Sequence, residues 1–168
     1  IKIDGACCAF IDGEFYKRYD CKEGRKPPNG FIPCCEPDKI TGHWPGWIKC
    51  DRNNPADKWF WKAYDNCSMY ASMGPPKVQI TPIKGDELYS DVQKIPVTLE
   101  AYGLHFNGNP YHLSEDGLIF HGQFKVEVER TFDGIKKYLS ESYVEGLVFW
   151  KDGQAQCKIK RSDFGLPW

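Results

Sequence analysis

Apolar and polar residues alternate along the last part of the chain in the pattern of a β-hairpin. Two runs of β-prone residues, 144–150 and 155–161, flank the pair Asp152-Gly153. An Asp-Gly pair between two such runs is a strong signal for a two-residue hairpin turn. The pattern therefore predicts two antiparallel strands joined at these two residues.

The turn sets which side chains lie opposite each other. Counting outward from it places Glu145 opposite Lys160 and Leu147 opposite Lys158. Side chains alternate between the two faces of a strand, so Glu145, Lys158 and Lys160 are expected on one face. The other face is expected to be apolar and to carry Val148, Trp150, Cys157 and Ile159. A carboxylate beside two ammonium groups has the chemistry to bind a metal ion and a phosphate. The same pattern also fits a surface strand pair joined by an ion pair.

A second Asp-Gly pair near the start of the chain predicts another hairpin. Asp12-Gly13 lies between the apolar run 6–11 and the run 14–19. Arg18 is on the return strand, and simple pairing places it opposite Cys7. The residues that follow, 23–58, contain many prolines and Asn-Gly or Pro-Gly pairs, which exclude long elements.

The remaining pattern predicts strands with few helices. Further strands are expected over 97–103, 118–121 and 123–130. A short helix is expected over 65–72, and another over 136–142 with Asp133 as its cap. Four tryptophans are expected to pack beneath the loops: Trp44, Trp47, Trp59 and Trp61. Residues 1–168 read as one α+β domain built on antiparallel strands, which is a usual size for a single domain.

Charge and apolar content narrow the classes of partner. The net charge is −1, so bulk electrostatics do not favour nucleic-acid binding. Contact with a polyanion would come from a local cluster such as Lys158, Lys160 and Arg161. No apolar run approaches the roughly 20 residues needed to cross a membrane, and no secretory signal is visible. We therefore expect no membrane association.

The eight cysteines raise the question of a zinc site or disulfides. The nearest metal-binding set is Cys34, Cys35, His43 and Cys50, but its spacing matches no structural zinc pattern. We expect reduced, mostly buried thiols in an intracellular protein, cytoplasmic or nuclear.

Four short motifs give a more specific indication. In order along the chain they are Lys2-Ile3-Asp4-Gly5, Thr98 to Gly103, Glu145-Gly-Leu-Val-Phe149 and Lys158-Ile159-Lys160. Each motif alone occurs often by chance. In this order they resemble the covalent nucleotidyltransferases, which include polynucleotide ligases and capping enzymes. Within that superfamily the chain is most similar to the small ATP-dependent RNA ligases of the eukaryotic 5′-to-3′ type. Segments 42–47, 107–111, 121–124 and 164–168 support the resemblance, whereas about 50–96 matches poorly.

This resemblance implies a fold and a reaction. The fold would be a nucleotidyltransferase (ligase adenylylation) domain, in which antiparallel sheets clasp the nucleotide. A lysine would attack the α-phosphate of ATP, and AMP would pass to a 5′-phosphate RNA end. A 3′-hydroxyl would then displace AMP and seal the two ends. The implied cofactors are ATP and Mg²⁺ or Mn²⁺, and the implied partner is RNA with those two ends.

The resemblance also assigns roles to individual residues. Lys2 would be the nucleophile, with Lys158 and Lys160 on the α-phosphate oxygens. Glu145 would hold the metal, and Glu100 would contact the ribose or the metal. The remaining nucleotide contacts would come from the backbone of Ile1 and Gly5, from Arg18, and from His121 stacked on the base. Phe120 and Phe124 would then point into the core, and Asp4 would orient its loop.

Two features separate this chain from others of the superfamily. Family members carry a further segment before the lysine, so an upstream N-terminal segment is expected to be missing here. No oligonucleotide-binding-fold motif follows Trp168, which favours an RNA ligase over DNA ligases and capping enzymes. A GTP-dependent capping guanylyltransferase stays open as an alternative, and so does a noncatalytic RNA- or nucleotide-binding domain. Neither the oligomeric state nor the natural RNA follows from the sequence.

Overall fold

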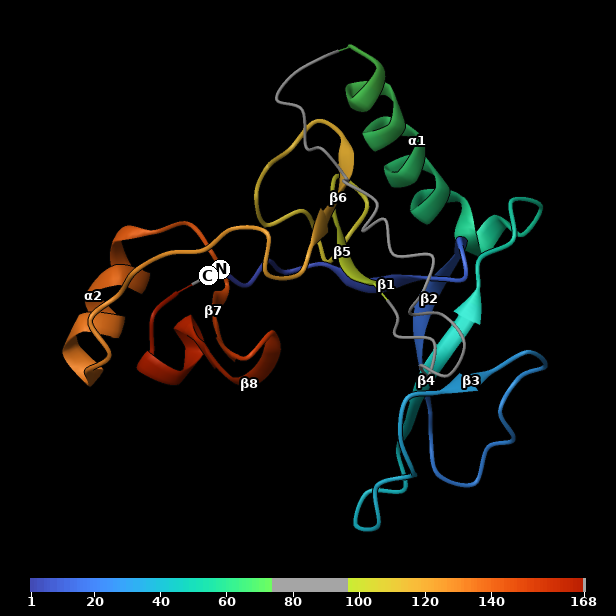
Figure 1. The fold of residues 1–168 in the computed structure, drawn as a ribbon, viewed down its shortest axis with the longest axis horizontal. Helices are drawn as coiled ribbons and strands as arrows, with labels where there is room; N and C mark the ends of the chain where they lie inside the picture. The colour runs from blue at the N-terminus through green and yellow to red at the C-terminus, as the bar shows by residue number, and fades with distance from the viewer. Residues whose placement is uncertain (74–96, 168) are drawn as a thin grey trace.

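A six-stranded antiparallel sheet forms the larger part of the molecule. The computed structural model describes residues 1–73 and 97–167 (Figure 1). The strand order in the sheet is β3-β4-β2-β1-β5-β6, and every neighbouring pair is antiparallel. The bounds of these strands are β1 Ala6–Ile11, β2 Glu14–Cys21, β3 Ile32–Pro33, β4 Trp44–Lys49, β5 Val97–Gly103 and β6 Asp116–Phe120.

A separate two-stranded sheet lies beside the large one. It consists of β7 (Gly146–Lys151) and β8 (Gln154–Lys160). Helix α1 (Lys58–Met73) covers the large sheet next to β6, and α2 (Phe132–Glu141) lies with the small sheet (Figure 1). Two 3₁₀ turns, Pro55–Asp57 and Arg161–Phe164, complete the described elements. The expected α+β architecture with antiparallel strands is confirmed. No helix in the described ranges has the length and apolar character to span a bilayer.

Both predicted hairpins are present, and their turns explain why. Asp12 and Gly13 have φ values of 52° and 75°, and Asp152 and Gly153 have 50° and 75°. A two-residue turn with positive φ at both positions matches the twist of antiparallel strands, and Asp-Gly tolerates it well. In the first hairpin Cys8 pairs with Lys17, as simple counting from the turn requires.

The register of the second hairpin differs from the expected one. Next to the turn Trp150 pairs with Ala155, but Phe149 pairs with Cys157, so a β-bulge shifts the rest of the ladder by one residue. Leu147 consequently pairs with Ile159, and Val148 with Lys158. The expected pairings of Leu147 with Lys158 and of Glu145 with Lys160 are therefore wrong by one position.

This slip exchanges the faces of β7 relative to β8, because one residue moves a side chain to the opposite side of a sheet. Ile159 remains on the core side, as expected. Leu147 and Ile159 pack in a core cluster with Leu139. Val148 and Trp150, which were expected in a core, instead share the other face with Lys158. The bulge thus turns an aromatic residue away from the core and toward the charged side.

Helix α1 is longer than predicted. Residues 65–72 were expected to be helical, whereas the helix begins at Lys58. Trp59 and Trp61, expected beneath loops, lie on this helix and pack on the core of the large sheet. Their aromatic side chains favour strands by local propensity. Packing of one helix face on the apolar residues of the sheet outweighs that preference.

The region before β7 also differs from the prediction. Residues 123–130 alternate as a strand would, yet they form no strand. Val128 packs on the Leu139 cluster, but an apolar face alone does not supply a hydrogen-bonding neighbour strand. Helix α2 begins at Phe132 and not at residue 136, because the Thr131 hydroxyl accepts the backbone N–H of Gly134 at 3.0 Å. Thr131, and not Asp133, is the cap.

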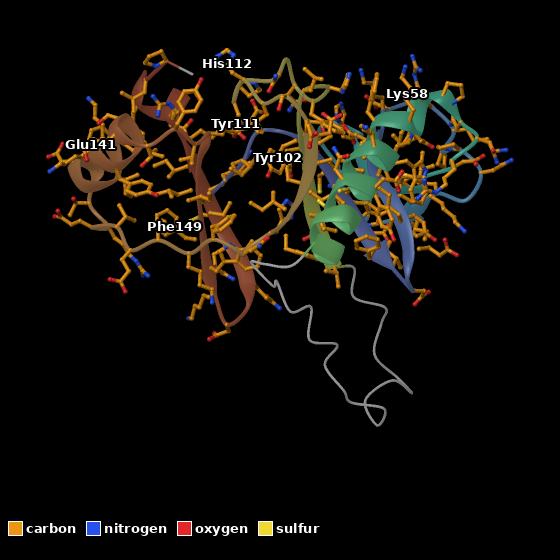
Figure 2. All side chains as sticks on the ribbon, turned by 90° about the horizontal axis from the view of Figure 1, so that it is seen from above. Lys58, Tyr102, Tyr111, His112, Glu141 and Phe149 are labelled. Atoms are coloured by element: carbon orange, nitrogen blue, oxygen red, sulfur yellow. The ribbon has the colours of Figure 1, made fainter. Side chains whose placement is uncertain are left out.

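A tyrosine links the large sheet to the N-terminal segment and to the region before β7. The Tyr111 hydroxyl accepts the backbone N–H of Asp4 at 2.6 Å. Its ring contacts Tyr102 of β5 at 6.3 Å and Tyr143 at 6.1 Å between ring centroids, and Figure 2 shows Tyr102 and Tyr111 between the two sheets. Burial raises the pKa of the Tyr111 hydroxyl to about 12, so this hydroxyl stays neutral. The two sheets are thereby held on either side of residues 1–5.

Leu139 is the centre of the core behind the small sheet, and its removal is expected to destabilise the protein. The side chain is 0% exposed. Leu139→Ala should lower the free energy of unfolding by about 2–5 kcal/mol, because it removes buried methyl groups and leaves a cavity. Urea unfolding measures the change. Leu104→Ala, the same substitution at a side chain that is 46% exposed, is the matched control and should cost much less.

Candidate functional site

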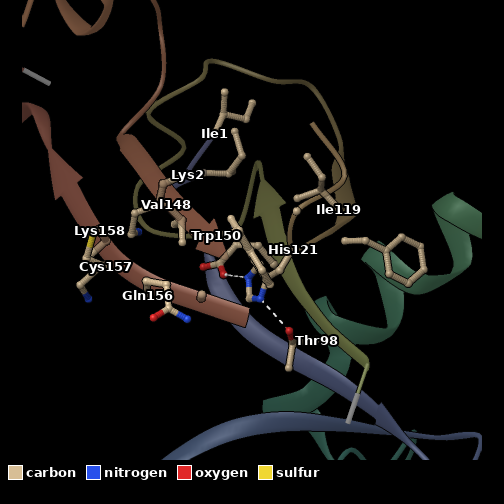
Figure 3. Close-up of a pocket in the computed structure, with 15 residues that line it drawn as sticks. Ile1, Lys2, Thr98, Ile119, His121, Val148, Trp150, Gln156, Cys157 and Lys158 are labelled. Atoms are coloured by element: carbon tan, nitrogen blue, oxygen red, sulfur yellow. Dashed lines mark hydrogen bonds and ion pairs between the residues drawn. The ribbon is translucent and has the colours of Figure 1, made fainter. Parts of the chain in front are cut away.

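A cavity of about 600 Å³ lies between the two sheets (Figure 3). Its walls come from residues 1–3, from β5 and the end of β6, and from the β7–β8 hairpin. Cavities of this size typically bind small molecules. Segments from both ends of the chain therefore meet around one space that a small ligand can occupy.

Lys2 and Glu145 come together on one side of this cavity. The backbone N–H of Lys2 donates to the Gly146 carbonyl at 2.8 Å, and the Glu145 N–H donates to the Lys2 carbonyl at 3.2 Å. These bonds hold residue 2 beside the start of β7, although 143 positions separate Lys2 from Glu145. The Lys2 ammonium forms an ion pair with one oxygen of the Glu145 carboxylate.

The other oxygen of Glu145 binds a second lysine. Lys160 Nζ lies 3.0 Å from Glu145 Oε1. The hydrogen bond to Glu145 and the charge of that carboxylate raise the pKa of Lys160. The expected association of Glu145 with Lys160 is therefore present, although it does not arise from cross-strand pairing. Glu145 lies just before β7, and its side chain reaches both ammonium groups.

Lys158 lines the cavity itself, while Lys160 reaches the site through Glu145. Lys158 is opposite Val148 in the shifted register, on the face that borders the cavity. Lys2 and Ile1 line the cavity as well. Ile1, Lys2 and Lys158 therefore border one space, and the negative charge of Glu145 lies next to it through the contact with Lys2.

Glu100 and His121 form the opposite wall. His121 Nδ1 lies 2.9 Å from Thr98 Oγ1, and Nε2 lies 2.9 Å from Glu100 Oε2 (Figure 3). His121 follows β6 in a turn and is oriented by these two partners. Phe120 packs partly against the core, as expected. Phe124 is 52% exposed, so its expected place in the core is wrong, because the chain leaves the sheet after residue 120.

Trp150 is a cavity residue that the sequence pattern assigned to the core. Its indole lines the cavity, where Figure 3 places it close to His121. A Cβ built on Gly122 would lie 3.5 Å from this ring, so the indole lies against the turn after β6. The β-bulge decides this orientation. A partly exposed indole in a cavity provides a flat surface for stacking on a base.

Two residues predicted to contact the nucleotide do not line this cavity. Arg18 packs over the Trp47 ring at 5.3 Å and donates to Cys34 Sγ at 3.2 Å, and it is not part of the cavity wall. Gly5 is also outside the wall. A Cβ at Gly5 would lie 2.3 Å from the Ala101 carbonyl oxygen, so glycine permits a close approach to β5. Asp4 orients its loop as expected, because its carboxylate accepts Asn107 Nδ2 at 2.7 Å.

The set Cys34, Cys35, His43 and Cys50 does not come together as a metal site, as its spacing led us to expect. All eight lie in the described ranges, and each is a free thiol. Cys34 and Cys35 are exposed, whereas Cys50 is buried in the core beneath α1. Within residues 1–73 and 97–167, one group of three potential metal ligands is close together, and it consists of Cys7, Glu100 and His121.

Comparison with known proteins identifies the family. A sequence model of the RNA ligase 1 family matches residues 29–168. RNA ligase 1 of Pongo abelii is 28% identical over 181 aligned residues, which cover 92% of this chain and 53% of that protein. RNA ligase 1 of Danio rerio is 28% identical over 145 residues, which cover 76% of this chain and 42% of that protein. RNA ligase 1 of Rattus norvegicus is 26% identical over 179 residues, which cover 89% of this chain and 52% of that protein.

The matched ranges cover part of the relatives and most, but not all, of the site residues. The chain spans about half the length of the curated relatives it matches. The family model includes Glu100, His121, Glu145 and both lysines of β8, whereas Lys2 precedes the matched range. Because that range covers most of the chain, the chain belongs to the RNA ligase 1 family.

Proposed function

We propose that this chain is the nucleotidyltransferase domain of an ATP-dependent RNA ligase, in which Lys2 becomes covalently attached to AMP. The observation that carries the proposal is the contact between Lys2 and Glu145 beside a cavity that Lys158 also lines. Membership of the RNA ligase 1 family supports RNA as the substrate. The cavity volume suits a mononucleotide.

The proposed first step is attack of Lys2 Nζ on the α-phosphate of ATP. A bond forms between nitrogen and phosphorus, the bond to the leaving pyrophosphate breaks, and a proton leaves Nζ. The free amine is the nucleophile, so the ion pair with Glu145 must open before attack. Glu145 Oε2, which contacts Nζ, is placed to accept the proton. Lys160 stays on the other oxygen and holds the carboxylate in place.

Positive charge beside the α-phosphate would come from Lys158. Its side chain lines the cavity on the same hairpin face as Val148. Phosphoryl and nucleotidyl transfer depend mostly on positioning and on neutralising the phosphate charge. An ammonium fixed on a strand provides both, since the strand limits its movement. Lys160 would add charge on the same side through its contact with Glu145.

The carboxylates of Glu145 and Glu100 offer the oxygen ligands that a magnesium ion would use. Mg²⁺ is commonly bound by one or two carboxylates together with substrate phosphates. The side chains of Glu145 and Glu100 are each only 13% exposed. Both are paired with side chains that can move aside, namely two lysines and His121. A bound ion would neutralise charge on the phosphates.

The nucleoside would occupy the part of the cavity that Trp150 and the end of β6 line. The indole of Trp150 offers a stacking surface for adenine, and His121 lies close to it (Figure 3). We assign stacking to Trp150 in addition to His121, because both rings line the cavity. Hydrogen bonds of both His121 ring nitrogens to β5 fix the orientation of the imidazole. Glu100 would then lie near the ribose.

Labelling with nucleotide tests the proposal. The longest natural form of the protein is incubated with Mg²⁺ and either α-labelled ATP or α-labelled GTP, then denatured. Label from ATP is expected to stay on the protein, with release of pyrophosphate. Adding RNA with 5′-phosphate and 3′-hydroxyl ends should move the label to RNA and yield a sealed strand. Label from GTP alone would point to a capping guanylyltransferase, and no label from either in a folded protein would point to a noncatalytic binding domain. Both outcomes would overturn the proposal.

A further inference from the structure

Three side chains with different metal-binding atoms meet where β1, β5 and the end of β6 lie side by side. The thiol of Cys7, a carboxylate oxygen of Glu100 and a ring nitrogen of His121 all lie within 4.8 Å of one another. The three residues are half-buried. Glu100 and His121 also line the cavity, so the group has access to small solutes.

The large sheet sets this arrangement through its register. Cys7 on β1 is the cross-strand partner of Glu100 on β5, and Glu100 is in turn the partner of Ile119 on β6. Cross-strand partners place their side chains on the same face. Their neighbours Cys8 and Leu99 pack in the core beneath α1, so Cys7 and Glu100 point to the opposite face. Two of the three donors are therefore held by paired strands.

His121 is held as histidine ligands of metals usually are. A ligating histidine commonly uses its second ring nitrogen in a hydrogen bond that fixes the ring orientation. Here Nδ1 bonds to Thr98 Oγ1 at 2.9 Å, which leaves Nε2 directed at Glu100. Thr98 lies two residues before Glu100 on β5, on the same face.

We propose that Cys7, Glu100 and His121 bind a thiophilic divalent cation of the Zn²⁺ class, with its fourth coordination position open to the cavity. Sulfur, nitrogen and oxygen ligands suit Zn²⁺, whereas Mg²⁺ prefers oxygen alone. Three protein ligands and one open position are the pattern of accessible zinc sites. The site shares Glu100 with the magnesium site proposed above, but its sulfur and nitrogen ligands give it a different metal preference.

Binding of the cation requires the Cys7 thiol to lose its proton. Burial, with a contribution from the charge of Glu100, raises the pKa of the Cys7 thiol to about 12, so the free protein holds the thiol form at neutral pH. The bond between sulfur and the cation forms as the thiol proton passes to solvent. Cation binding therefore occurs with release of one proton from Cys7. The ring proton of His121 shifts from Nε2, which faces Glu100, to Nδ1, which then donates to Thr98 Oγ1.

A cation here would interfere with nucleotide binding. It would occupy Glu100 and His121, both of which border the cavity. We expect Zn²⁺ at low concentration to weaken binding of ATP to the protein. This consequence, unlike the cation site itself, rests on the proposed function.

Cobalt is the probe for the site, because a cobalt–thiolate bond absorbs light. The full natural protein, free of metal and kept reduced, is titrated with Co²⁺ in the absence of nucleotide. A near-ultraviolet thiolate-to-cobalt band is expected to saturate at one equivalent and to disappear on addition of Zn²⁺. Cys7→Ser should abolish the band. Thr98→Val should weaken binding by about 10- to 100-fold, the usual effect of losing an outer hydrogen bond.

Matched variants separate this site from the exposed thiols. The doubly substituted protein Cys34→Ser with Cys35→Ser should keep the band, and so should Cys157→Ser. His121→Gln, at a surface turn away from the core, gives a second test that does not depend on folding around Cys7. Circular dichroism checks the fold of each variant. A band that persists in folded Cys7→Ser, or that is lost with Cys34 and Cys35, would overturn the proposal.

The experiment keeps the two proposals apart. Cobalt binding is measured without ATP, so its failure leaves the ligase proposal intact. Absence of the adenylate would leave a confirmed cobalt site intact. Zn²⁺ should lower the affinity for a fluorescent ATP analogue in the parent protein but not in Cys7→Ser. Equal inhibition in both proteins would place the inhibitory ion elsewhere and contradict the consequence drawn above.

Discussion

The protein with Lys2→Ala is expected to form no covalent adenylate. Lys2 lines the cavity and its ammonium contacts Glu145, whereas alanine has no nucleophile. Removing the attacking group should lower adenylate formation below detection. Binding of ATP should persist, because Lys158, Glu100 and Trp150 remain. Denaturing gels with α-labelled ATP measure the adenylate, and equilibrium binding measures the nucleotide.

Arginine at position 2 distinguishes loss of the nucleophile from loss of the ion pair with Glu145. Lys2→Arg keeps a positive charge that can pair with Glu145, but the guanidinium does not lose its proton in proteins and cannot act as a nucleophile. It should fold normally and stay unlabelled. Lys151→Ala, at an exposed position beside the hairpin turn, is the lysine control and should be labelled as the parent is. Peptide mapping that found AMP on any other lysine would refute the assignment.

The second large effect is expected at Glu145. Glu145→Gln keeps the shape of the side chain but removes the charge that holds Lys2 and Lys160 and would bind the metal ion. We expect adenylate formation to slow by about 10²- to 10³-fold, the usual range for losing one positioned electrostatic group. The loss should be greatest at limiting Mg²⁺, because the second carboxylate at Glu100 cannot replace the first.

Glu141→Gln is the matched control for this prediction. Glu141 is an exposed carboxylate at the end of α2, outside the cavity wall. The same change in charge should leave the rate unaltered. Rates of single-turnover labelling at several Mg²⁺ concentrations, with unfolding midpoints for both variants, make the comparison. If Glu145→Gln reacts at the parent rate with limiting Mg²⁺, Glu145 has only a structural role.

Local sequence determined the elements whose signals lie within a few residues. The two Asp-Gly turns adopt the positive φ angles that this pair favours, so both hairpins form where the sequence predicts them. The strand Val97–Gly103 ends where the sequence predicts, because its β-prone residues end at a glycine. The motifs also identified Lys2, Glu145, Lys158 and Lys160 as a group by resemblance, without any knowledge of their contacts.

Tertiary structure decided everything that depends on a partner distant in the chain. Residues 123–130 alternate correctly but have no neighbouring strand, while Trp59 and Trp61 become helical because the sheet offers them an apolar surface. Arg18 was predicted to contact the nucleotide, and the structure places it over Trp47, its cross-strand partner on β4, outside the cavity wall. Local patterns contain no information about which strand will become a neighbour.

The site itself combines both kinds of information. The sequence by itself determined which residues have the chemistry, and it placed Glu145, Lys158 and Lys160 on or next to one hairpin. Only the folded chain decided the β-bulge that turns Trp150 toward the cavity, and the backbone bonds that place Lys2 beside Glu145. A bulge changes which face every later residue occupies, and a contact across 143 positions forms only when both sheets are assembled. The local sequence thus determines which reactive side chains are present, whereas their positions relative to one another depend on packing between distant parts of the chain.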